Sequence, residues 1–384
     1  MENQHLINFI KSLYPSKEVI HLHEPLFTGR EKELLSNCVD STFVSTSGEY
    51  LGRFEKLLAE YLDVAHVILT VNGTSALHLA LKGLGVEQDD EVITQPLTFI
   101  ATANAISYCG AHPIFIDVNR ETLGLDPFKL KAFLNSSCEI RDSSCFNKTT
   151  GRKISACIPM HTFGIASEIE ELVKVCRSWN IAIIEDSAES LGSKFNNQAL
   201  GTFGDAGVFS FNGNKIITTG GGGAICTNNK QLADKLRHLG TTAKKQHPYR
   251  FIHDEIGYNY RMTNINAALG VAQMENLNTF LQIKNNIYKK YEEFFRDSDW
   301  KVVVDNRPNS EPNNWLISIL APSQHKKIEL LEYGIKNDVH LRGAWDLMTE
   351  LPMYTKYSTN NYDNAKFIYN RLINLPSGIN GYKR

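Results

Sequence analysis

The sequence predicts an α/β protein in which a mostly parallel sheet is covered by helices on both faces. Two observations predict this fold class. Short apolar runs rich in β-branched residues recur between residues 66 and 227, and most are followed by a turn and a segment with helical spacing. This alternation is typical of strand–helix–strand crossover units, which produce parallel strands with helices packed on both sides.

Seven of these runs are predicted as strands. Each is short, apolar and bounded by turn-forming residues, as the buried strands of a parallel sheet are. In chain order they are residues 66–70, 91–96, 112–118, 154–160, 181–187, 206–211 and 222–227. Ligands of such sheets bind outside the carboxyl ends of the strands, so we expect the functional residues in the loops that follow them.

Helical spacing, with apolar residues three and four apart, occurs between several of these strands. The clearest segments are residues 75–85, 100–110 and 168–180. Residues 138–153, between two predicted strands, are polar and aperiodic. We expect this segment to be a surface excursion.

The pattern changes after about residue 230. A helical run at 232–240 is followed by a polar stretch and then by a long helical pattern from Asn264 to about Arg296. The remainder mixes the strand-like WLISIL with helical segments, which predicts a smaller α+β domain. We expect residues 1–245 to form the large domain, with the N-terminal segment, and residues 246–384 to contain the connecting helix and the small domain.

The composition argues against several classes of protein. The 384 residues carry 40 basic and 42 acidic side chains, a net charge of -2, whereas nucleic-acid binding needs an excess of Lys and Arg. No apolar stretch is long enough to predict a membrane span. Seven cysteines without a CxxC pair or zinc-type spacing predict reduced thiols, no metal site and a cytoplasmic protein.

The first segment that carries chemistry follows the first predicted strand. In VNGTSALHLAL the strand ends at Asn72, Gly73 permits a tight turn, and Thr74 and Ser75 open a helix. A helix N-terminus presents backbone N–H groups and hydroxyl donors to an anion, so a phosphate suits this position. An ordinary Ser/Thr helix cap explains the segment equally well when it is taken alone.

The second segment is IAIIEDSAES, where an apolar strand ends in Glu185 and Asp186. Because neighbouring residues of a strand point to opposite faces, one carboxylate lies at the ligand crevice and the other points away. A carboxylate in the crevice can pair with a protonated ring nitrogen of a cofactor. An acidic helix start after a strand is the ordinary alternative.

The third segment, GTFGDAGVFSFNGNKIITTGGGGAI, is the most specific. It places Lys215 in an apolar, glycine-rich context, whereas most lysines lie on solvated surfaces. Burial of a lysine favours the neutral amine, the form that condenses with an aldehyde, so Lys215 is a candidate Schiff-base lysine. The glycine run matches neither the phosphate loop GxxxxGK(S/T) nor GxGxxG, which weakens nucleotide hydrolysis and dinucleotide binding as alternatives.

The three segments together supply what pyridoxal phosphate (PLP) requires of a protein. Its phosphate needs hydrogen-bond donors, its ring nitrogen needs an acid partner, and its aldehyde needs an amine. Each segment has an ordinary explanation when taken alone, but their joint occurrence along one sheet predicts a PLP site.

These segments also resemble a known family, the fold type I, PLP-dependent sugar aminotransferases of the DegT/StrS type. The resemblance extends over nearly the whole chain and is most specific in NGTSALHLAL, IEDSAESLGS, FSFNGNKIITTGGGG and IGYNYRMTNINAALG. It implies a fold type I transferase with a seven-stranded large domain. Among these enzymes the chain looks closest to the legionaminic-acid-type members, which aminate the 4-keto group of a nucleotide-linked 6-deoxy sugar.

The resemblance assigns roles to individual residues. Lys215 matches the lysine that holds the cofactor and Asp186 the partner of its ring nitrogen. Gly73, Thr74 and Ser210 match phosphate-binding positions, and Phe99 matches an aromatic residue that stacks on the ring. Asn259 matches a residue that reaches the phosphate of the other subunit, which implies a homodimer with shared active sites.

Other matches are looser. Glu189 stands where relatives usually have a Gln or His that touches the ring hydroxyl, and Gly221 where many have Glu. His161 aligns with a histidine near the substrate, although a strand-end His is more often structural. Arg342 and Trp345 fall in a segment that looks like one near the substrate entrance, with Gly343 replacing a proline.

The resemblance implies transfer of an amino group from L-glutamate to a sugar nucleotide, with UDP favoured, for surface polysaccharide or nonulosonic acid synthesis. One alternative is PLP-dependent sugar dehydration, but that branch of the family has a histidine where this chain has Lys215. The other is a catalytically silent regulator of the same fold, which the filled cofactor positions and the lack of a basic helix-turn-helix extension make less favoured.

Overall fold

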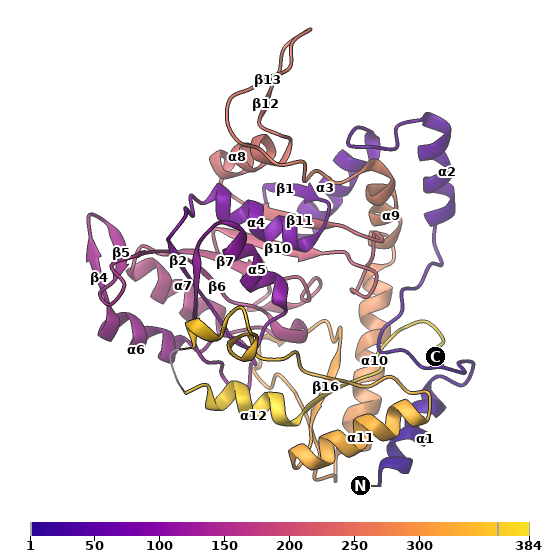
Figure 1. The fold of residues 1–384 in the computed structure, drawn as a ribbon. Coiled ribbons are helices and arrows are strands. Elements are labelled where there is room, and N and C mark those ends of the chain that lie inside the picture. Colours follow the sequence, from indigo (N-terminus) through magenta and orange to yellow (C-terminus); the bar gives the residue numbers. More distant parts are fainter. Residues whose placement is uncertain (1, 359–360, 384) are drawn as a thin grey trace.

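One sheet contains all seven strands that the sequence predicts (Figure 1). In the computed structural model, which describes residues 2–358 and 361–383, their order is β1-β11-β10-β7-β6-β2-β3. β11 runs antiparallel to both of its neighbours, and the other adjacent pairs are parallel, so the mostly parallel sheet is confirmed. The strands are β1 (His66–Thr70), β2 (Glu91–Thr94), β3 (His112–Phe115), β6 (Lys153–Ile158), β7 (Ala182–Asp186), β10 (Ala206–Ser210) and β11 (Gly223–Thr227).

Helices cover both faces of this sheet. Consecutive strand residues such as Ile183 and Ile184 are both buried, because they point into different layers. One face is covered by α4 (Gly73–Gly83), α5 (Ile100–Tyr108) and α8 (Lys230–Gly240). The other is covered by α6 (Pro127–Ser137), α7 (Ile169–Ser178), α3 (Glu49–Leu62) and α9 (Asn264–Met274).

Side-chain caps explain where several helices begin. Asn72 accepts a hydrogen bond from the Ser75 N–H at the start of α4, and Asn229 accepts one from Leu232 at the start of α8. Asp126 caps α6 in the same way, and Pro127 follows at the first helical position, where a missing N–H costs nothing. The helices therefore start where strand-end loops supply short polar side chains.

The polar segment 138–153, predicted as a surface excursion, contains a β-hairpin that extends the sheet. β4 (Cys138–Arg141) and β5 (Ser144–Asn147) pair with each other, and β5 pairs with β6. Asp142 and Ser143 form the two-residue turn with φ of 47° and 60°, the left-handed values that a tight hairpin of this kind needs. Burial alternates along β5, but one of its two buried residues is Asn147, so the apolar pattern of the sequence does not reveal the strand.

The long helical pattern from Asn264 to Arg296 is divided into two helices, α9 and α10 (Leu277–Phe295). The break lies at Asn276, whose side-chain N–H donates to the carbonyl oxygen of Ala272 at 3.2 Å. An asparagine that bonds the backbone locally competes with the helix, which explains the break.

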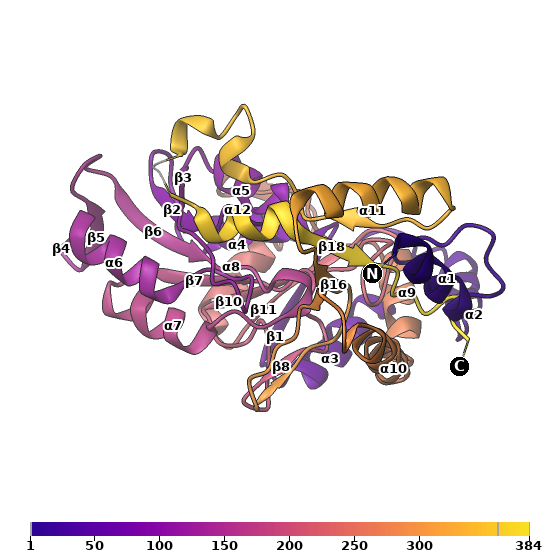
Figure 2. The same cartoon turned by 90° about the horizontal axis from the view of Figure 1, so that it is seen from below.

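A second, antiparallel sheet forms the C-terminal part of the chain in the order β14-β16-β18-β17. Figure 2 shows α11 and α12 on one side of it and α10 on the other. Its elements are β14 (Lys301–Val302), β16 (Ile317–Leu320), β17 (Arg342–Gly343), β18 (Leu372–Leu375), α11 (Gln324–Lys336) and α12 (Asp363–Arg371). The division at residue 245 remains a prediction.

The N-terminal helix α1 (Asn3–Leu13) packs on this C-terminal part. Its buried face, made of Leu6, Ile7, Ile10 and Leu13, lies in the same core as α10 and α11. Phe9 stacks on Phe294 of α10 with ring centroids 4.2 Å apart. The N-terminal helix is therefore fixed to the C-terminal part of the chain.

The remaining elements are short or peripheral. They are α2 (Glu31–Ser41), a sheet of β8 (Lys194–Phe195), β9 (Gln198–Ala199) and β15 (Ser310–Glu311), and three single 3-10 turns, η1 (Thr162–Gly164), η2 (Met348–Glu350) and η3 (Thr355–Tyr357). All seven cysteines are buried and free of disulfides. Within residues 2–358 and 361–383, no helix combines the length and apolarity that crossing a membrane requires.

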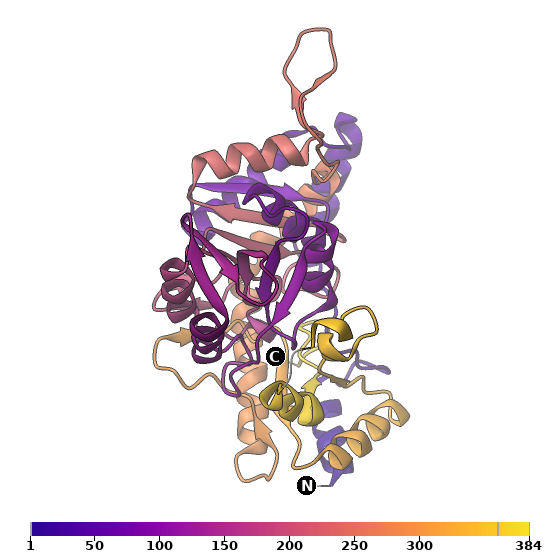
Figure 3. The same cartoon turned by 60° about the vertical axis from the view of Figure 1, so that its left-hand side comes forward.

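A hairpin arm, residues 244–255, projects from the body of the molecule (Figures 1 and 3). It is built on β12 (Lys244–Lys245) and β13 (Ile252–His253). Tyr249 is 85% exposed and Phe251 81% exposed, so large apolar side chains at the tip have little cover within the chain.

The contact between α3 and α9 predicts a sharp difference between two glycines. A Cβ on Gly270 of α9 would lie 2.5 Å from the Phe54 ring of α3, whereas a Cβ on Gly52 of α3 would meet nothing. We expect Gly270→Ala to lower the free energy of unfolding by about 1 to 3 kcal/mol through overpacking. Gly52→Ala should raise it by roughly 0.5 to 1 kcal/mol through helix propensity.

Chemical denaturation of the two variants and the unchanged protein measures both effects. Equal midpoints for Gly270→Ala and Gly52→Ala would contradict the close packing of α3 on α9.

Candidate active site

A cavity of about 250 Å³ opens at the carboxyl ends of β1, β7 and β10. This is the edge of the sheet where the sequence places the functional residues. Eight of the predicted site residues line the cavity together, although they come from distant parts of the chain. They are Gly73, Thr74, Phe99, Asp186, Glu189, Ser210, Lys215 and Trp345.

The start of α4 forms one end of the cavity. Gly73 and Thr74 occupy the first turn, where backbone N–H groups lack acceptors within the helix. Ser210 faces them from the end of β10, so closely that a Cβ on Gly73 would lie 3.0 Å from the Ser210 Cβ. A side chain at residue 73 would crowd Ser210, and the N–H groups with the Ser210 hydroxyl make a site for an anion.

Asp186 supplies a buried acid in the middle of the cavity. Its carboxylate accepts hydrogen bonds from the Thr102 hydroxyl at 2.7 Å and from the Ala188 N–H at 3.2 Å. Burial raises the pKa of this carboxyl above its usual range, and the two hydrogen bonds oppose the rise. Both partners are neutral, so a cation placed next to Asp186 would be strongly favoured.

Glu185, the neighbour of Asp186, points to the other side of the strand. It accepts hydrogen bonds from the backbone of Gly201, Phe203 and Gly204 and faces His161. The two adjacent acids therefore have separate roles, one structural and one in the cavity.

Lys215 supplies the amine. It follows β10 in a turn closed by its own N–H, which donates to the Asn212 carbonyl at 3.0 Å. The side chain is only 13% exposed, and its Nζ lies 3.1 Å from Glu189 Oε1. On another side, Nζ lies 4.3 Å from the centre of the Trp315 ring.

Glu189 holds the opposite charge next to Lys215. It is buried, and its second carboxylate oxygen accepts a hydrogen bond from the Phe163 N–H at 2.9 Å. Burial raises the pKa of Glu189, whereas the charge of Lys215 lowers it. The protonation of Glu189 therefore depends on the charge of Lys215.

Aromatic side chains form the open side of the cavity. Phe99 is 49% exposed at the start of α5, and its ring packs edge-on against Trp345 with centroids 6.1 Å apart. Trp345 also packs on Phe163 at 4.8 Å. These rings offer an apolar surface on which a flat ligand can stack.

Three predicted site residues do not line this cavity. His161 is fully buried, with Nε2 2.9 Å from Glu185 and Nδ1 accepting a hydrogen bond from the Ser167 N–H, so it is a structural contact of Glu185. Arg342 is exposed on β17. Asn259 is exposed and bridges to Thr241 at the base of the arm.

Sequence reasoning missed two residues of the site. Thr102 donates a hydrogen bond to Asp186 but lies in the first turn of α5, where a threonine gives no signal of its own. Trp315 lines the cavity, yet its sequence context, just before an apolar strand, predicts only a core residue.

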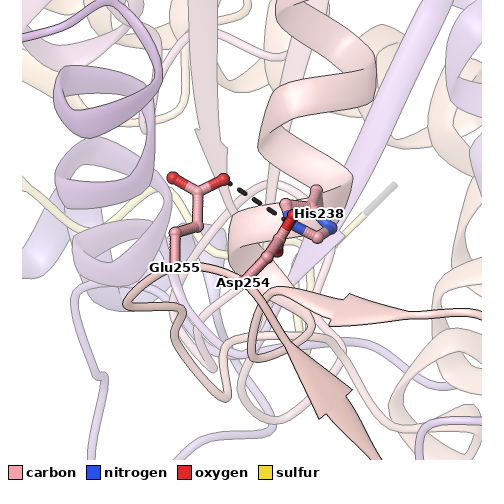
Figure 4. A group of neighbouring side chains, drawn as sticks. All are labelled: His238, Asp254 and Glu255. Carbon is pink, nitrogen blue, oxygen red and sulfur yellow. Dashed lines mark hydrogen bonds and ion pairs between the residues drawn. The ribbon is translucent and has the colours of Figure 1, made fainter.

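A group of His238, Asp254 and Glu255 lies at the base of the arm (Figure 4). The His238 Nε2 is 2.7 Å from Asp254 and 3.5 Å from Glu255, and Lys245 pairs with the other oxygen of Asp254 at 2.9 Å. These contacts tie the arm to α8. None of the three residues lines the cavity.

The residues of the cavity fit PLP. Asp186 is a buried acid with only neutral hydrogen-bond partners, the first turn of α4 with Ser210 is an anion site, and Lys215 is an amine between them. An acid for the ring nitrogen, donors for a phosphate and an amine for an aldehyde are the groups that this cofactor uses.

Comparison with known proteins agrees with this geometry. The profile of the DegT/DnrJ/EryC1/StrS aminotransferase family matches residues 26–380. The GDP-perosamine synthase of Escherichia coli O157:H7 is 38% identical over 360 residues, covering 93% of each chain. The UDP-4-amino-4,6-dideoxy-N-acetyl-beta-L-altrosamine transaminase of Campylobacter jejuni (strain 81-176) is 31% identical over 330 residues, covering 84% of this chain and 83% of that protein.

The fold comparison points the same way. The structure of Helicobacter pylori PseC, an aminotransferase involved in the biosynthesis of pseudoaminic acid, superposes with a TM-score of 0.84 at 25% identity and 93% coverage of both chains. The chain therefore belongs to the DegT/DnrJ/EryC1/StrS family of PLP-dependent sugar aminotransferases.

Proposed function

We propose that this enzyme transfers an amino group from L-glutamate to the 4-keto carbon of a nucleotide-linked 6-deoxy sugar. The observation that carries the proposal is the single cavity in which Lys215, Asp186 and the start of α4 meet. Both curated relatives described above are named for nucleotide-linked sugars, which supports a substrate of this class.

Each group in the cavity has its own role in the proposed reaction. Bound PLP supplies an aldehyde that exchanges amines and a ring that withdraws electrons. Asp186 would keep the ring nitrogen cationic, and Gly73, Thr74 and Ser210 would hold the phosphate. Lys215 would hold the aldehyde end and, once an amino donor has freed it, would move a proton at Nζ from one carbon atom to another.

Glu189 would contact the ring oxygen of the cofactor in this reaction. In the structure its carboxylate neutralises Lys215. When the Lys215 nitrogen is engaged by the cofactor, Glu189 loses that partner, and burial then favours its protonated form. A protonated Glu189 can donate a hydrogen bond to the ring oxygen, the contact that a Gln or His makes in relatives.

Dehydration of the sugar is the nearest alternative reaction. We favour amino transfer because Lys215 is present, whereas the dehydrating relatives have a histidine at this position. A free lysine amine can move protons reversibly in both halves of a transamination. We place the reaction in the cytoplasm, because seven buried free thiols suit a reducing compartment.

The choice of nucleotide rests on two lines of support. The sequence resemblance favours UDP, whereas the GDP-perosamine synthase is more similar, at 38% against 31% for the UDP-named transaminase. Both nucleotides carry a diphosphate, and nucleotide contacts are commonly made by loops, whose residues vary with the substrate. We therefore propose a nucleoside-diphosphate sugar, with UDP and GDP forms as the first to be compared.

We also propose a homodimer in which each chain completes the other's site. Asn259 is exposed and lies outside its own cavity, although the family resemblance gives it a contact with the cofactor phosphate. The arm presents Tyr249 and Phe251, and Ile256 directly follows it; all three are more than 80% exposed and need an apolar cover. A second copy of the chain can provide that cover.

The substitution Lys215→Ala tests the proposed role of Lys215 as the amine that holds the cofactor. The unchanged protein, reconstituted with PLP, should show the visible absorption band of lysine-bound cofactor, and L-glutamate should bleach it. Lys215→Ala should lack the band and lose at least about 100-fold in turnover, because no other amine lines the cavity. The surface variant Lys56→Ala is the matched control. A band and full turnover in Lys215→Ala would refute the proposal.

A panel of substrates tests which nucleotide-linked sugar accepts the amino group. UDP-, GDP- and dTDP-linked 4-keto-6-deoxy sugars are incubated with the enzyme and L-glutamate, and the masses of the products are measured by mass spectrometry. We expect one nucleotide form to give the amino sugar. A product that has lost water and gained no nitrogen would instead establish dehydration.

Mixing two inactive variants tests the shared site. Asn259→Asp places a carboxylate against the cofactor phosphate, whereas Lys215→Ala removes the amine. If the partner's Asn259 completes each site, random re-pairing should restore about a quarter of the native activity, since half of the dimers then carry one intact site. Activity no higher than that of the separate variants would exclude the shared arrangement.

A further inference from the structure

Trp315 connects the C-terminal part of the chain to the amine of Lys215. It lies just before β16, one hundred residues after Lys215, and it is only 3% exposed. Its side chain lines the same cavity as Lys215. Trp315 does more than fill the core, because it makes two contacts with Lys215 and the residue before it.

The two contacts restrain both ends of Lys215. The indole N–H donates to the backbone carbonyl of Asn214 at 2.7 Å, which fixes the chain directly before the lysine. The face of the ring lies 4.3 Å from Lys215 Nζ, close enough for a cation–π contact. With Glu189 3.1 Å away, the ammonium group is held between a ring face and a carboxylate.

Trp315 is itself anchored on both sides by buried groups. Its backbone N–H donates to Asn313 Oδ1 at 2.9 Å, and the Asn313 side-chain amide donates in turn to the backbone carbonyls of Glu189 and Leu191. One asparagine therefore holds both of the groups that face Lys215.

The carbonyl of Trp315 has a second anchor. It accepts hydrogen bonds from Lys284 Nζ at 2.7 Å and from the Ser377 hydroxyl at 2.8 Å. Lys284 is completely buried on α10, and its amine also donates to the Ser377 carbonyl at 2.6 Å. These bonds tie the Trp315 backbone to the middle of α10 and to the segment just after β18, so the residue has little freedom to move.

We propose that Trp315 is a positioning residue for Lys215: the indole N–H sets the lysine backbone, and the ring face sets the amine. The role rests on the proposed function of Lys215 as the lysine that holds the cofactor. Through it, the C-terminal part of the chain determines where the amine stands before the cofactor arrives and whenever the amine is free during turnover.

The experiment measures capture of PLP by the cofactor-free protein. Trp315→Phe keeps a ring face but loses the indole N–H, and Trp315→Leu loses both. Stopped-flow absorption gives the rate at which the lysine-bound band appears, and visible circular dichroism reports how the captured cofactor is oriented. Trp300→Phe is the matched control, since Trp300 is 1% exposed and does not line the cavity.

We expect capture to slow by about threefold in Trp315→Phe and by about tenfold or more in Trp315→Leu. The circular dichroism per bound cofactor should fall in the same order, and Trp300→Phe should match the unchanged protein in both measurements. Thermal melting of each variant without cofactor separates these effects from unfolding.

Native capture rates and circular dichroism in Trp315→Leu would overturn the inference while leaving the role of Lys215 intact. An equal slowing in Trp300→Phe would also overturn it, because the effect would then follow from general loss of packing. Failure of the unchanged protein to form the band would instead refute the proposed function.

Discussion

The site depends on one backbone pairing. Gly223 of β11 lies opposite Thr70 of β1 on one side and opposite Ser210 of β10 on the other. The two parallel strands therefore end at the same level, which brings the start of α4 next to Ser210 and the lysine turn. A Cβ on Gly223 would lie 2.6 Å from the backbone of Asn72, so this junction admits only glycine.

Around this junction the chain concentrates ionisable groups that water would otherwise solvate. Asp186 and Glu189 are both buried, and burial raises the pKa of each. Only Lys215 among the cavity-lining residues brings a positive charge. A cofactor with a cationic ring and an anionic phosphate complements this arrangement, with its ring beside the acids and its phosphate at the helix start. Because the whole chain has a net charge of only -2, attraction for a sugar nucleotide must come from residues near the site.

Much of the large sheet and of the cofactor end of the site could be predicted from the sequence. The strands are short, apolar and bounded by turn-forming residues. Each polar segment at the end of β1, β7 and β10 has an ordinary explanation alone, but together the three segments predict the cofactor site. The split of the predicted helix at Asn276 depends on one side-chain hydrogen bond, which periodicity does not reveal. Trp315 was missed because its partners, Asn214 and Lys284, are 101 and 31 residues away. The placement of His161 was equally hidden, since only the fold shows that its nitrogens are taken by Glu185 and Ser167.

The N-terminal helix has a consequence for how the protein is made. α1 is synthesised long before α10 and α11, yet its buried face packs against both of these helices. Leu6, Ile7 and Ile10 therefore lack their packing partners until α10 and α11 have been translated. Apolar surface of this kind attracts chaperones and favours aggregation. The large sheet can assemble meanwhile, and docking of α1 then closes the C-terminal part that anchors Trp315.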